Sequence, residues 1–358
     1  MFTKLKQEIF SVKLARLLTH LMFTISITFT IFSAHAVDSV EDEYEQFNYL
    51  KKIDTCINNI KKSGLYDGTQ EQLNQYCKVE TLKKSFKPGR YAKRILEEKM
   101  TEFNPFVITP HKPSYILPAT ITDNFNREPY EFVEDYALGM KIVEAKYQVS
   151  FKIPLNSGDL LTRGDGLYFG MTIKAWWQLY SSEISKPFRE TNYQPEIFYR
   201  SPLPWKPFGG NMGYAVSFEH QSNGQTQILS RSWNRIVGSL IFEKGDYMLM
   251  FNPWYRIPET DKTDPLSSKG DDNPDIEDYM GNYEMYAAYA FNDHNKITVL
   301  VRKNWRTGNG AIELNYTYPL QKKLIGTIQY FSGYGESMID YDHKQQKFGL
   351  GIALTEIF

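Results

Sequence analysis

Two side chains that together can perform acyl transfer, His220 and Ser222, stand two residues apart in the sequence. If this segment is a β-strand, both side chains project from one face, with roughly 7 Å between their Cα atoms. A serine hydroxyl becomes a strong nucleophile when a neighbouring histidine takes its proton. The pair therefore predicts acyl-transfer chemistry, while an inert histidine and serine at the rim of a β-barrel is the alternative interpretation.

Asn234 is the candidate for the group that orients the histidine ring. Residues 232–242 follow the pattern of a second strand, and pairing it with residues 213–222 as a hairpin puts Asn234 beside His220. An amide oxygen can accept the second imidazole proton, although it stabilises the imidazolium less than a carboxylate does. Glu219, the nearest acid in the sequence, points to the opposite face and is a poor substitute.

Several longer motifs surround these residues, and together they resemble the outer membrane phospholipase A family of Gram-negative bacteria. The likeness covers residues 104–358. The motifs are HQSNG at 220–224, SRSWNR at 230–235, WWQL at 176–179, PFRETNY at 187–193, DNPDI at 272–276 and SGYGESMIDY at 332–341.

The composition agrees with a barrel that crosses a membrane with strands. Among 358 residues, 15% are aromatic, which is usual for barrels with aromatic girdles, and a helical membrane protein would be far more hydrophobic. The net charge of -1 gives no basic excess, so nucleic acid is not an expected partner.

The N-terminus predicts export. Basic residues precede an apolar run over residues 17–32, and Ala34-His35-Ala36 supplies a cleavage site of the small-x-small type. Residues 1–36 are therefore expected to be a signal peptide, and an uncleaved anchor helix is the alternative. Export would bring Cys56 and Cys77 into an oxidising compartment, where they can form a disulfide.

Residues 37–103 are polar and helical in period, and we expect them to form a periplasmic extension. Apolar residues recur at intervals of three and four from Phe47 through Leu50 to Ile60, and Gly64 ends this helix. Residues 69–72 read as a capping box that opens a second helix, and a third helix is expected over residues 91–100. A Cys56–Cys77 disulfide would clip the first two helices together. The family resemblance does not extend to this part of the chain.

From Ser114 onward the period changes to two, which predicts an all-β fold: a 12-stranded antiparallel transmembrane β-barrel over residues 104–358. With the N-terminus in the periplasm, the fifth strand runs outward, so His220 and Ser222 lie near the outer leaflet on the lipid-facing wall. The terminal Phe358 resembles the export signal of outer membrane barrels. The expected strands are residues 115–122, 144–155, 166–180, 192–202, 212–222, 232–244, 246–256, 278–291, 296–304, 310–319, 323–332 and 346–357.

By resemblance, the enzyme needs Ca²⁺ and works as a homodimer. The family's calcium ligands correspond to the carbonyl of Gln225, the hydroxyl of Ser230 and the carbonyl of Ser185 of the partner subunit, all oxygen ligands that suit this cation. The resemblance also makes the Gly224 amide the candidate donor to the oxyanion.

Three positions depart from the family pattern. Gln225 stands where the family often has arginine, Gln227 where it commonly has an acid, and Ile173 where it has a glutamine at the dimer interface. A carbonyl ligand should survive the first change. The lack of an acid at Gln227 weakens the calcium binding that is expected outside the dimer. At Ile173, an apolar contact can replace the polar contact of the interface glutamine.

The resemblance implies hydrolysis of phospholipids at both the A1 and A2 positions, and of lysophospholipids. The competing hypothesis is a barrel without catalysis, such as a small porin or an adhesin. His111, His294 and His343 have no partner pattern and are expected in loops or on the surface. Other polar residues near the site fit either a functional or a structural role, and these are Asp271, Asp272, Asp275, Arg231 and Arg235.

Overall fold

The computed structural model describes residues 39–64, 68–85, 89–101, 107–132, 134–156, 158–264, 266–267, 269–321, 324–356 and 358. The predicted signal peptide, residues 1–36, lies outside the described residues. The chain separates into two compact units, Met1–Leu82 and Lys83–Phe358, and each is described by itself.

The first unit is a pair of helices joined by a disulfide. Helix α2 spans Ser39–Ser63 and α3 spans Gln70–Ser85. The predicted capping box is present, because the Thr69 amide donates to Gln72 Oε1 (2.9 Å) and the Gln72 amide to Thr69 Oγ1 (3.2 Å). The Cys56–Cys77 disulfide is formed, with 5.7 Å between the Cα atoms. It lies in a small core with Ile53 and Leu73.

The predicted apolar stripe of α2 is wrong at one position. Leu50 leaves 53% of its surface exposed, because the core with α3 begins one turn later, at Ile53. A two-helix unit has only one seam along which to bury apolar side chains, so its core is small.

Replacing both cysteines by serine is expected to destabilise the α2–α3 pair by about 3 kcal/mol, because the disulfide closes a loop of roughly twenty residues in the unfolded chain. Hydrogen exchange measured by mass spectrometry should then show faster exchange in α2 and α3, with the barrel strands unchanged. Unaltered protection of both helices would contradict this expectation.

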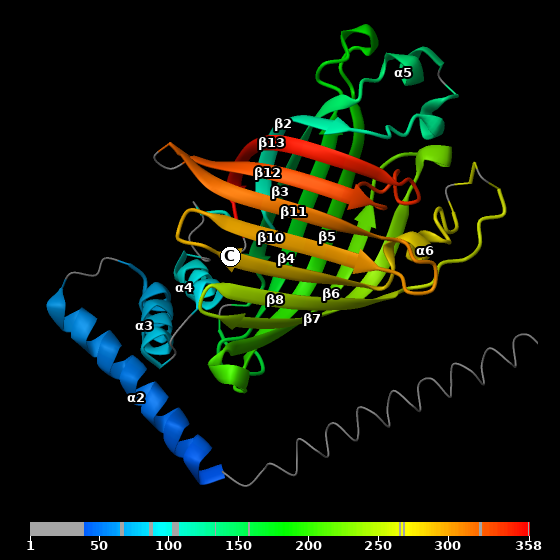
Figure 1. The fold of residues 1–358 in the computed structure, drawn as a ribbon. Coiled ribbons are helices and arrows are strands. Elements are labelled where there is room, and N and C mark those ends of the chain that lie inside the picture. Colours follow the sequence, from blue (N-terminus) through cyan, green and yellow to red (C-terminus); the bar gives the residue numbers. More distant parts are fainter. Residues whose placement is uncertain are drawn as a thin grey trace, which may run out of the picture. The chain divides into compact units, whose positions relative to one another are not determined.

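The second unit is a closed antiparallel β-barrel (Figure 1). In the described part of the chain, twelve strands pair with their sequence neighbours, and β13 pairs with β2 to close the sheet, as predicted. A two-residue strand, β1 (Thr109–Pro110), adds to β3. The barrel strands are β2 Ser114–Thr122, β3 Val143–Pro154, β4 Gly166–Trp177, β5 Phe188–Leu203, β6 Asn211–Ser222, β7 Ser232–Lys244, β8 Tyr247–Arg256, β9 Tyr283–Ala290, β10 Lys296–Lys303, β11 Gly310–Gln321, β12 Leu324–Gly333 and β13 Gln345–Thr355.

The strand predicted over residues 278–291 is wrong at its start, because α6 (Ile276–Met280) precedes β9. Ile276 and Met280 lie on one side of this short helix and are buried against Trp233 and Trp254. A further short helix, α5 (Glu134–Gly139), lies between β2 and β3. These helices cap the end of the barrel at which the loop between β6 and β7 also lies.

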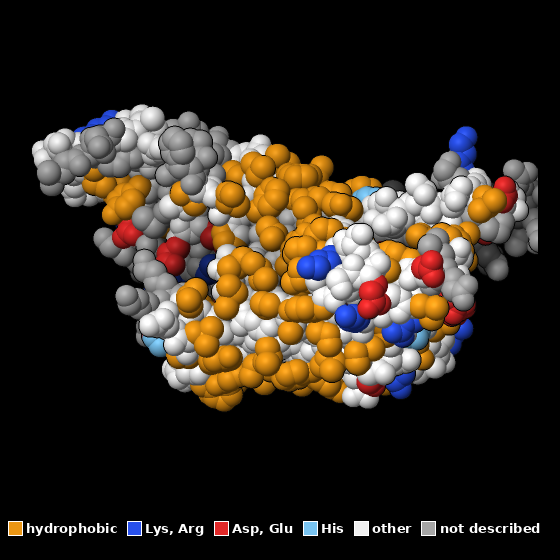
Figure 2. Space-filling view, turned by 90° about the horizontal axis from the view of Figure 1, so that it is seen from above, with side chains coloured by type: hydrophobic (Ala, Val, Ile, Leu, Met, Phe, Trp, Pro, Cys, Tyr) orange, Lys and Arg blue, Asp and Glu red, His pale blue; other side chains and the backbone are white. Residues whose placement is uncertain are grey.

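The barrel wall is apolar outside and polar inside. Val216 and Phe218 in β6 are half exposed, whereas Ser217 and Glu219, which alternate with them, are buried inside. Several buried charges are paired, as in the contact of 2.6 Å between Lys146 Nζ and Glu336 Oε1. Apolar side chains cover much of the wall in Figure 2. This alternation is that of a barrel whose outer face meets lipid. Among the described residues, no helix combines the length and the apolar character needed to cross a membrane.

Helix α4 (Arg90–Thr101) closes one end of the barrel interior. Its first amides, those of Tyr91 and Ala92, donate to the carboxylate of Glu243 at the end of β7. Glu98 of α4 forms an ion pair with Lys152 of β3, 2.6 Å apart. The third predicted helix is therefore present, but it belongs to the barrel unit, whereas it was expected in the extension over residues 37–103. The cause is that polar partners for α4 line the barrel interior.

Candidate active site

The hairpin of β6 and β7 brings His220 and Asn234 together. The two residues are directly opposite each other in the register of this pair, and Ser222 is opposite Ser232. His220, Ser222 and Asn234 all project from the outer, apolar face and are partly exposed. The predicted hairpin is therefore formed, with its loop at residues 223–231.

The imidazole of His220 is held by the amide of Asn234. The distance from His220 Nδ1 to Asn234 Oδ1 is 2.9 Å. Because an amide oxygen only accepts hydrogen bonds, Nδ1 carries the proton and Nε2 is left as the basic nitrogen of the neutral ring. Asn234 Nδ2 in turn donates to Glu259 Oε1 at 3.1 Å.

Glu219 points into the barrel, as its place in the strand predicted. Its carboxylate contacts Arg235, and it also accepts from Lys112 Nζ at 3.3 Å. Arg235 is thus a residue of the barrel interior, where its guanidinium stacks over the ring of Trp233. Neither charge reaches the outer face that carries His220.

The loop after Ser222 is held in shape by Asn223, whose side chain is buried. Asn223 Oδ1 accepts from the amides of Gln225 (3.2 Å) and Arg231 (3.0 Å), and Nδ2 donates to the carbonyl of Leu229 (2.7 Å). Gly224 has a φ of 64°, and a Cβ there would lie 3.3 Å from the ring of Tyr193. The positive φ and this close approach both favour glycine at the position predicted to supply the oxyanion amide.

The residues expected to bind calcium lie in two loops. Gln225 and Ser230 lie in the loop between β6 and β7, and Ser185 follows a short 3₁₀ turn between β4 and β5 with a φ of 62°. Ser230 Oγ donates to Asp272 Oδ2 at 2.6 Å, so a carboxylate stands beside this hydroxyl. Carbonyl, hydroxyl and carboxylate oxygens are the ligands that calcium prefers, and the residues fit this cation. Across the described ranges, no group of three or more His, Cys, Asp or Glu side chains is arranged to hold a metal ion.

The other acidic residues of the DNPDI region have structural partners. Asp271 forms an ion pair with Arg256 (2.6 Å), and Asp275 accepts from the hydroxyl of Tyr341 (2.7 Å). Asp272 also forms an ion pair with Lys262. Arg231 donates to the carbonyls of Ile228 and Ser230, and so helps to shape the loop.

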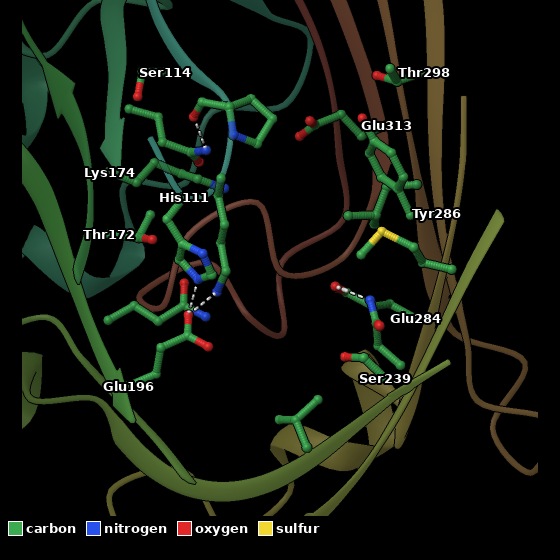
Figure 3. A pocket seen from close by; sticks show the side chains of 18 of the residues that line it. His111, Ser114, Thr172, Lys174, Glu196, Ser239, Glu284, Tyr286, Thr298 and Glu313 are labelled. Carbon is green, nitrogen blue, oxygen red and sulfur yellow. Dashed lines mark hydrogen bonds and ion pairs between the residues drawn. The ribbon is translucent and has the colours of Figure 1, made fainter. Parts of the chain in front are cut away.

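His111 lies in the short loop between β1 and β2, as expected for a loop residue, but its side chain does not face the surface. His111 is inside the barrel, where Nε2 is 2.9 Å from Glu196 Oε1 and the ring stacks on Phe198 with 4.7 Å between centroids (Figure 3). The barrel interior is polar, so a buried histidine finds a partner there without any role in chemistry. His294 and His343 lie in loops, as expected.

The barrel interior holds a cavity of about 320 Å³. Charged side chains line it from many strands, and His111, Lys112 and Glu196 form one cluster within it. Its lining includes neither His220, Ser222 nor Asn234. The histidine–asparagine pair is therefore on the outer wall, apart from this cavity.

Glu259 lies next to the histidine–asparagine pair, and sequence reasoning missed it. A signal for it exists, because Tyr255, Ile257 and Glu259 continue the alternation of β8 along its outward face. The strand itself ends at Arg256, and Pro258 and the long loop that follows make this continued alternation hard to recognise in the sequence.

Comparison with known proteins identifies the family. Residues 91–354 match the family model for phospholipase A1. The phospholipase A1 of Escherichia coli strain K12 is 37% identical over 259 residues, covering 71% of this chain and 84% of the relative. A putative phospholipase A1 of Neisseria meningitidis is 39% identical over 255 residues, covering 69% and 65%.

Solved structures agree with these relatives. The outer membrane phospholipase A of Escherichia coli superimposes with a TM-score of 0.65 at 35% identity, covering 72% of this chain and 95% of that one. The Salmonella typhi outer membrane phospholipase, a dimer with bound calcium, gives 0.66 at 34% identity, covering 75% and 98%. The closed twelve-stranded barrel and these relatives make the protein an outer membrane phospholipase. The chain belongs to the phospholipase A1 family of outer membrane β-barrel enzymes.

Proposed function

We propose that the chain is a calcium-dependent phospholipase in which Ser222 is the nucleophile, His220 the general base and Asn234 the group that orients His220. The observation that carries the proposal is the contact of 2.9 Å between His220 Nδ1 and Asn234 Oδ1 on the outer wall, with Ser222 on the same face. Among the similar solved structures is an active-site mutant of the Escherichia coli phospholipase in which an asparagine is replaced by alanine. An asparagine that takes part in catalysis supports the role given to Asn234.

The reaction proceeds by acyl transfer in two halves. Ser222 Oγ attacks the ester carbonyl while His220 Nε2 takes its proton, and the carbonyl oxygen becomes an oxyanion. The ester bond then breaks, and His220 returns the proton to the departing alcohol oxygen. Water attacks the acyl-serine with the same help from His220, which releases the fatty acid and restores Ser222. Asn234 keeps the ring in the required tautomer throughout.

The oxyanion is stabilised by hydrogen-bond donors and positive charge close to it. The amide of Gly224 is the proposed donor, since the backbone there adopts a conformation that favours glycine. Bound calcium would supply additional positive charge next to the oxyanion. The carbonyl of Gln225 and the hydroxyl of Ser230 would hold it, together with the carbonyl of Ser185 of the partner subunit. The dimeric, calcium-bound relative from Salmonella typhi supports this arrangement.

The substrate is proposed to lie along the outer wall. Val216, Phe218 and Ile236 are exposed on the face that leads to His220, so an acyl chain can lie against them. Because such a face contacts the acyl chain of the lipid and not its glycerol, we expect hydrolysis at both the A1 and A2 positions, and of lysophospholipids.

The orientation follows from the two ends of the barrel. Helix α4 lies at the end where β7 finishes, and the catalytic loop lies at the opposite end, where β7 begins. With the N-terminus in the periplasm, the catalytic end meets the outer leaflet. Residues 1–36 are proposed to be the signal peptide that exports the chain.

Positional specificity is tested with phospholipids that carry a label on one acyl chain only. Detergent-refolded protein with calcium should release label from both positional isomers and from the lysophospholipid. Release from a single isomer would limit the enzyme to that position. No release from any of the three would favour a barrel without catalysis, such as a porin or an adhesin.

A further inference from the structure

The carboxylate of Glu259 reaches the side of Asn234 that does not face His220. Asn234 Nδ2 donates to Glu259 Oε1 at 3.1 Å, and the backbone nearby is tied to the same residue, because the Ile257 amide donates to the Asn234 carbonyl at 2.8 Å. On the far side of Glu259, the Asp271 amide donates to the carbonyl of Thr260 at 2.8 Å. Glu259 is thus held between two backbone hydrogen bonds and is partly buried.

We propose that Glu259 is a positioning residue, which fixes the orientation of the Asn234 amide and, through it, the tautomer of His220. This inference rests on the proposed triad. It extends the proposed triad to a chain of four side chains, from Ser222 through His220 and Asn234 to Glu259. Only Ser222 and His220 take part directly, Ser222 by bonding to the substrate and His220 by transferring the proton.

The reason for such a residue lies in the symmetry of an amide. An asparagine can turn over and present its NH₂ group where its oxygen was, at almost no cost in volume. Turned over, Asn234 would donate to His220 Nδ1, which would then be the unprotonated nitrogen. Nε2 would carry the proton and would be unable to take one from Ser222.

A carboxylate removes this freedom. An ionised carboxylate has acceptors and no donors, so it can only satisfy the NH₂ end of Asn234. The oxygen end is then directed at His220, and the ring nitrogen that it contacts must be the protonated one. A triad with aspartate as its third member has no such ambiguity, because both ends of that group accept. A triad with asparagine requires a fourth group to choose the orientation.

Charge adds to the effect of geometry. A negative group on the NH₂ side polarises the amide and makes Oδ1 a stronger acceptor, which favours the imidazolium that forms when His220 takes the serine proton. The charged neighbours of Glu259 are Asp271, Asp272 and Arg256, and Arg256 is itself paired with Asp271. Burial, and then the nearby Asp271, raise the pKa of Glu259 from its usual value.

The test is a double-mutant cycle between Glu259 and Asn234, with kcat and KM measured separately on a detergent-dispersed phospholipid with calcium. In the Asn234 background, Glu259→Gln is expected to lower kcat about 10-fold with little change in KM, because glutamine can hold either orientation of the amide. In the Asn234→Asp background, the same Glu259→Gln change is expected to raise kcat about 10-fold. It removes the repulsion between two facing carboxylates, and the glutamine NH₂ group can donate a hydrogen bond to the new aspartate.

The reversal of sign separates positioning from a structural role. A residue that merely held the loop would lower activity in both backgrounds, and that result, or no effect in either, would overturn the inference. Asp261→Asn, an exposed carboxylate of the same loop, is the matched control and should leave kcat unchanged. Ser222→Ala is measured alongside. If it retains activity, the proposed triad fails, and the inference fails with it. If it is inactive while Glu259→Gln equals the wild type in both backgrounds, only the inference fails.

Discussion

Replacement of Ser222 by alanine is expected to lower kcat for phospholipid hydrolysis by about 10⁴-fold or more, because it removes the group to which the acyl chain is transferred. The folded barrel should be unaffected, since Ser222 is a partly exposed residue at the end of β6. Fatty acid release by the refolded variant, measured with calcium against the wild type, checks this. Equal release from both proteins would exclude Ser222 as the nucleophile.

Ser232 supplies a matched control for this experiment. It lies directly opposite Ser222 in the neighbouring strand, on the same outward face and two residues from Asn234. Its hydroxyl is, like that of Ser222, carried next to the histidine–asparagine pair. Ser232→Ala therefore tests whether Ser222 has been correctly assigned as the nucleophile. We expect this variant to keep activity within about twofold of the wild type, since exposed substitutions of this kind have small effects. Loss of activity in Ser232→Ala with activity retained in Ser222→Ala would reverse the assignment.

Removal of calcium is expected to have the second largest effect, a loss of at least about 100-fold in kcat, comparable to the loss of one oxyanion donor. The measurement is fatty acid release during titration with a calcium chelator, followed by restoration with excess calcium. Magnesium should restore the activity poorly, because it needs near-octahedral geometry and keeps its waters. Full activity in chelator would contradict the proposed role of Gln225 and Ser230.

The proposed dimer provides an independent test of the same site. If Ser185 of the partner subunit supplies a calcium ligand, a monomer enforced by covalent attachment of a bulky group on the interface should lose activity to the same extent as the chelated enzyme. Ile173 is the residue for that attachment, after its replacement by cysteine. It projects outward from β4, and by the family resemblance it stands where a glutamine is expected at the dimer interface. A fully active monomer of this kind would refute the requirement for a partner.

The barrel was predictable from sequence because its signal is repeated along most of the chain. Outward residues such as Val216 and Phe218 must be apolar to meet lipid, and the residues between them must be polar to fill the interior, so strand after strand carries the same alternation. The hairpin of β6 and β7 shows the same alternation. The short loop between His220 and Asn234 fixes the register in which these two strands pair. Strand bounds were therefore predicted to within a few residues, except where α6 replaces the start of β9.

What could not be predicted are the contacts made between segments far apart in sequence. His111 has no local pattern, and its partner Glu196 is 85 residues away, across the barrel interior. Helix α4 reads as part of the N-terminal extension, because nothing in its own sequence indicates that Glu243 will cap it. Glu259 follows a proline and precedes a long loop, so its position beside Asn234 depends on the register of β7 and β8. In each case the information lies in the pairing of distant strands.

The histidine–asparagine pair joins residues only 14 apart, within a single hairpin. The pairing that closes the barrel joins residues such as Thr122 and Gln346, which are 224 apart. By loop-closure entropy the second contact costs about 2 kcal/mol more than the first, and local hairpins form in microseconds. The catalytic pair should therefore assemble early in folding, before the chain has become a closed cylinder. A newly exported chain would then hold its proposed general base, His220, in the active orientation while its strands are still being inserted. Premature hydrolysis would be prevented because two required components, the second subunit and the calcium ion, bind only after the barrel has closed.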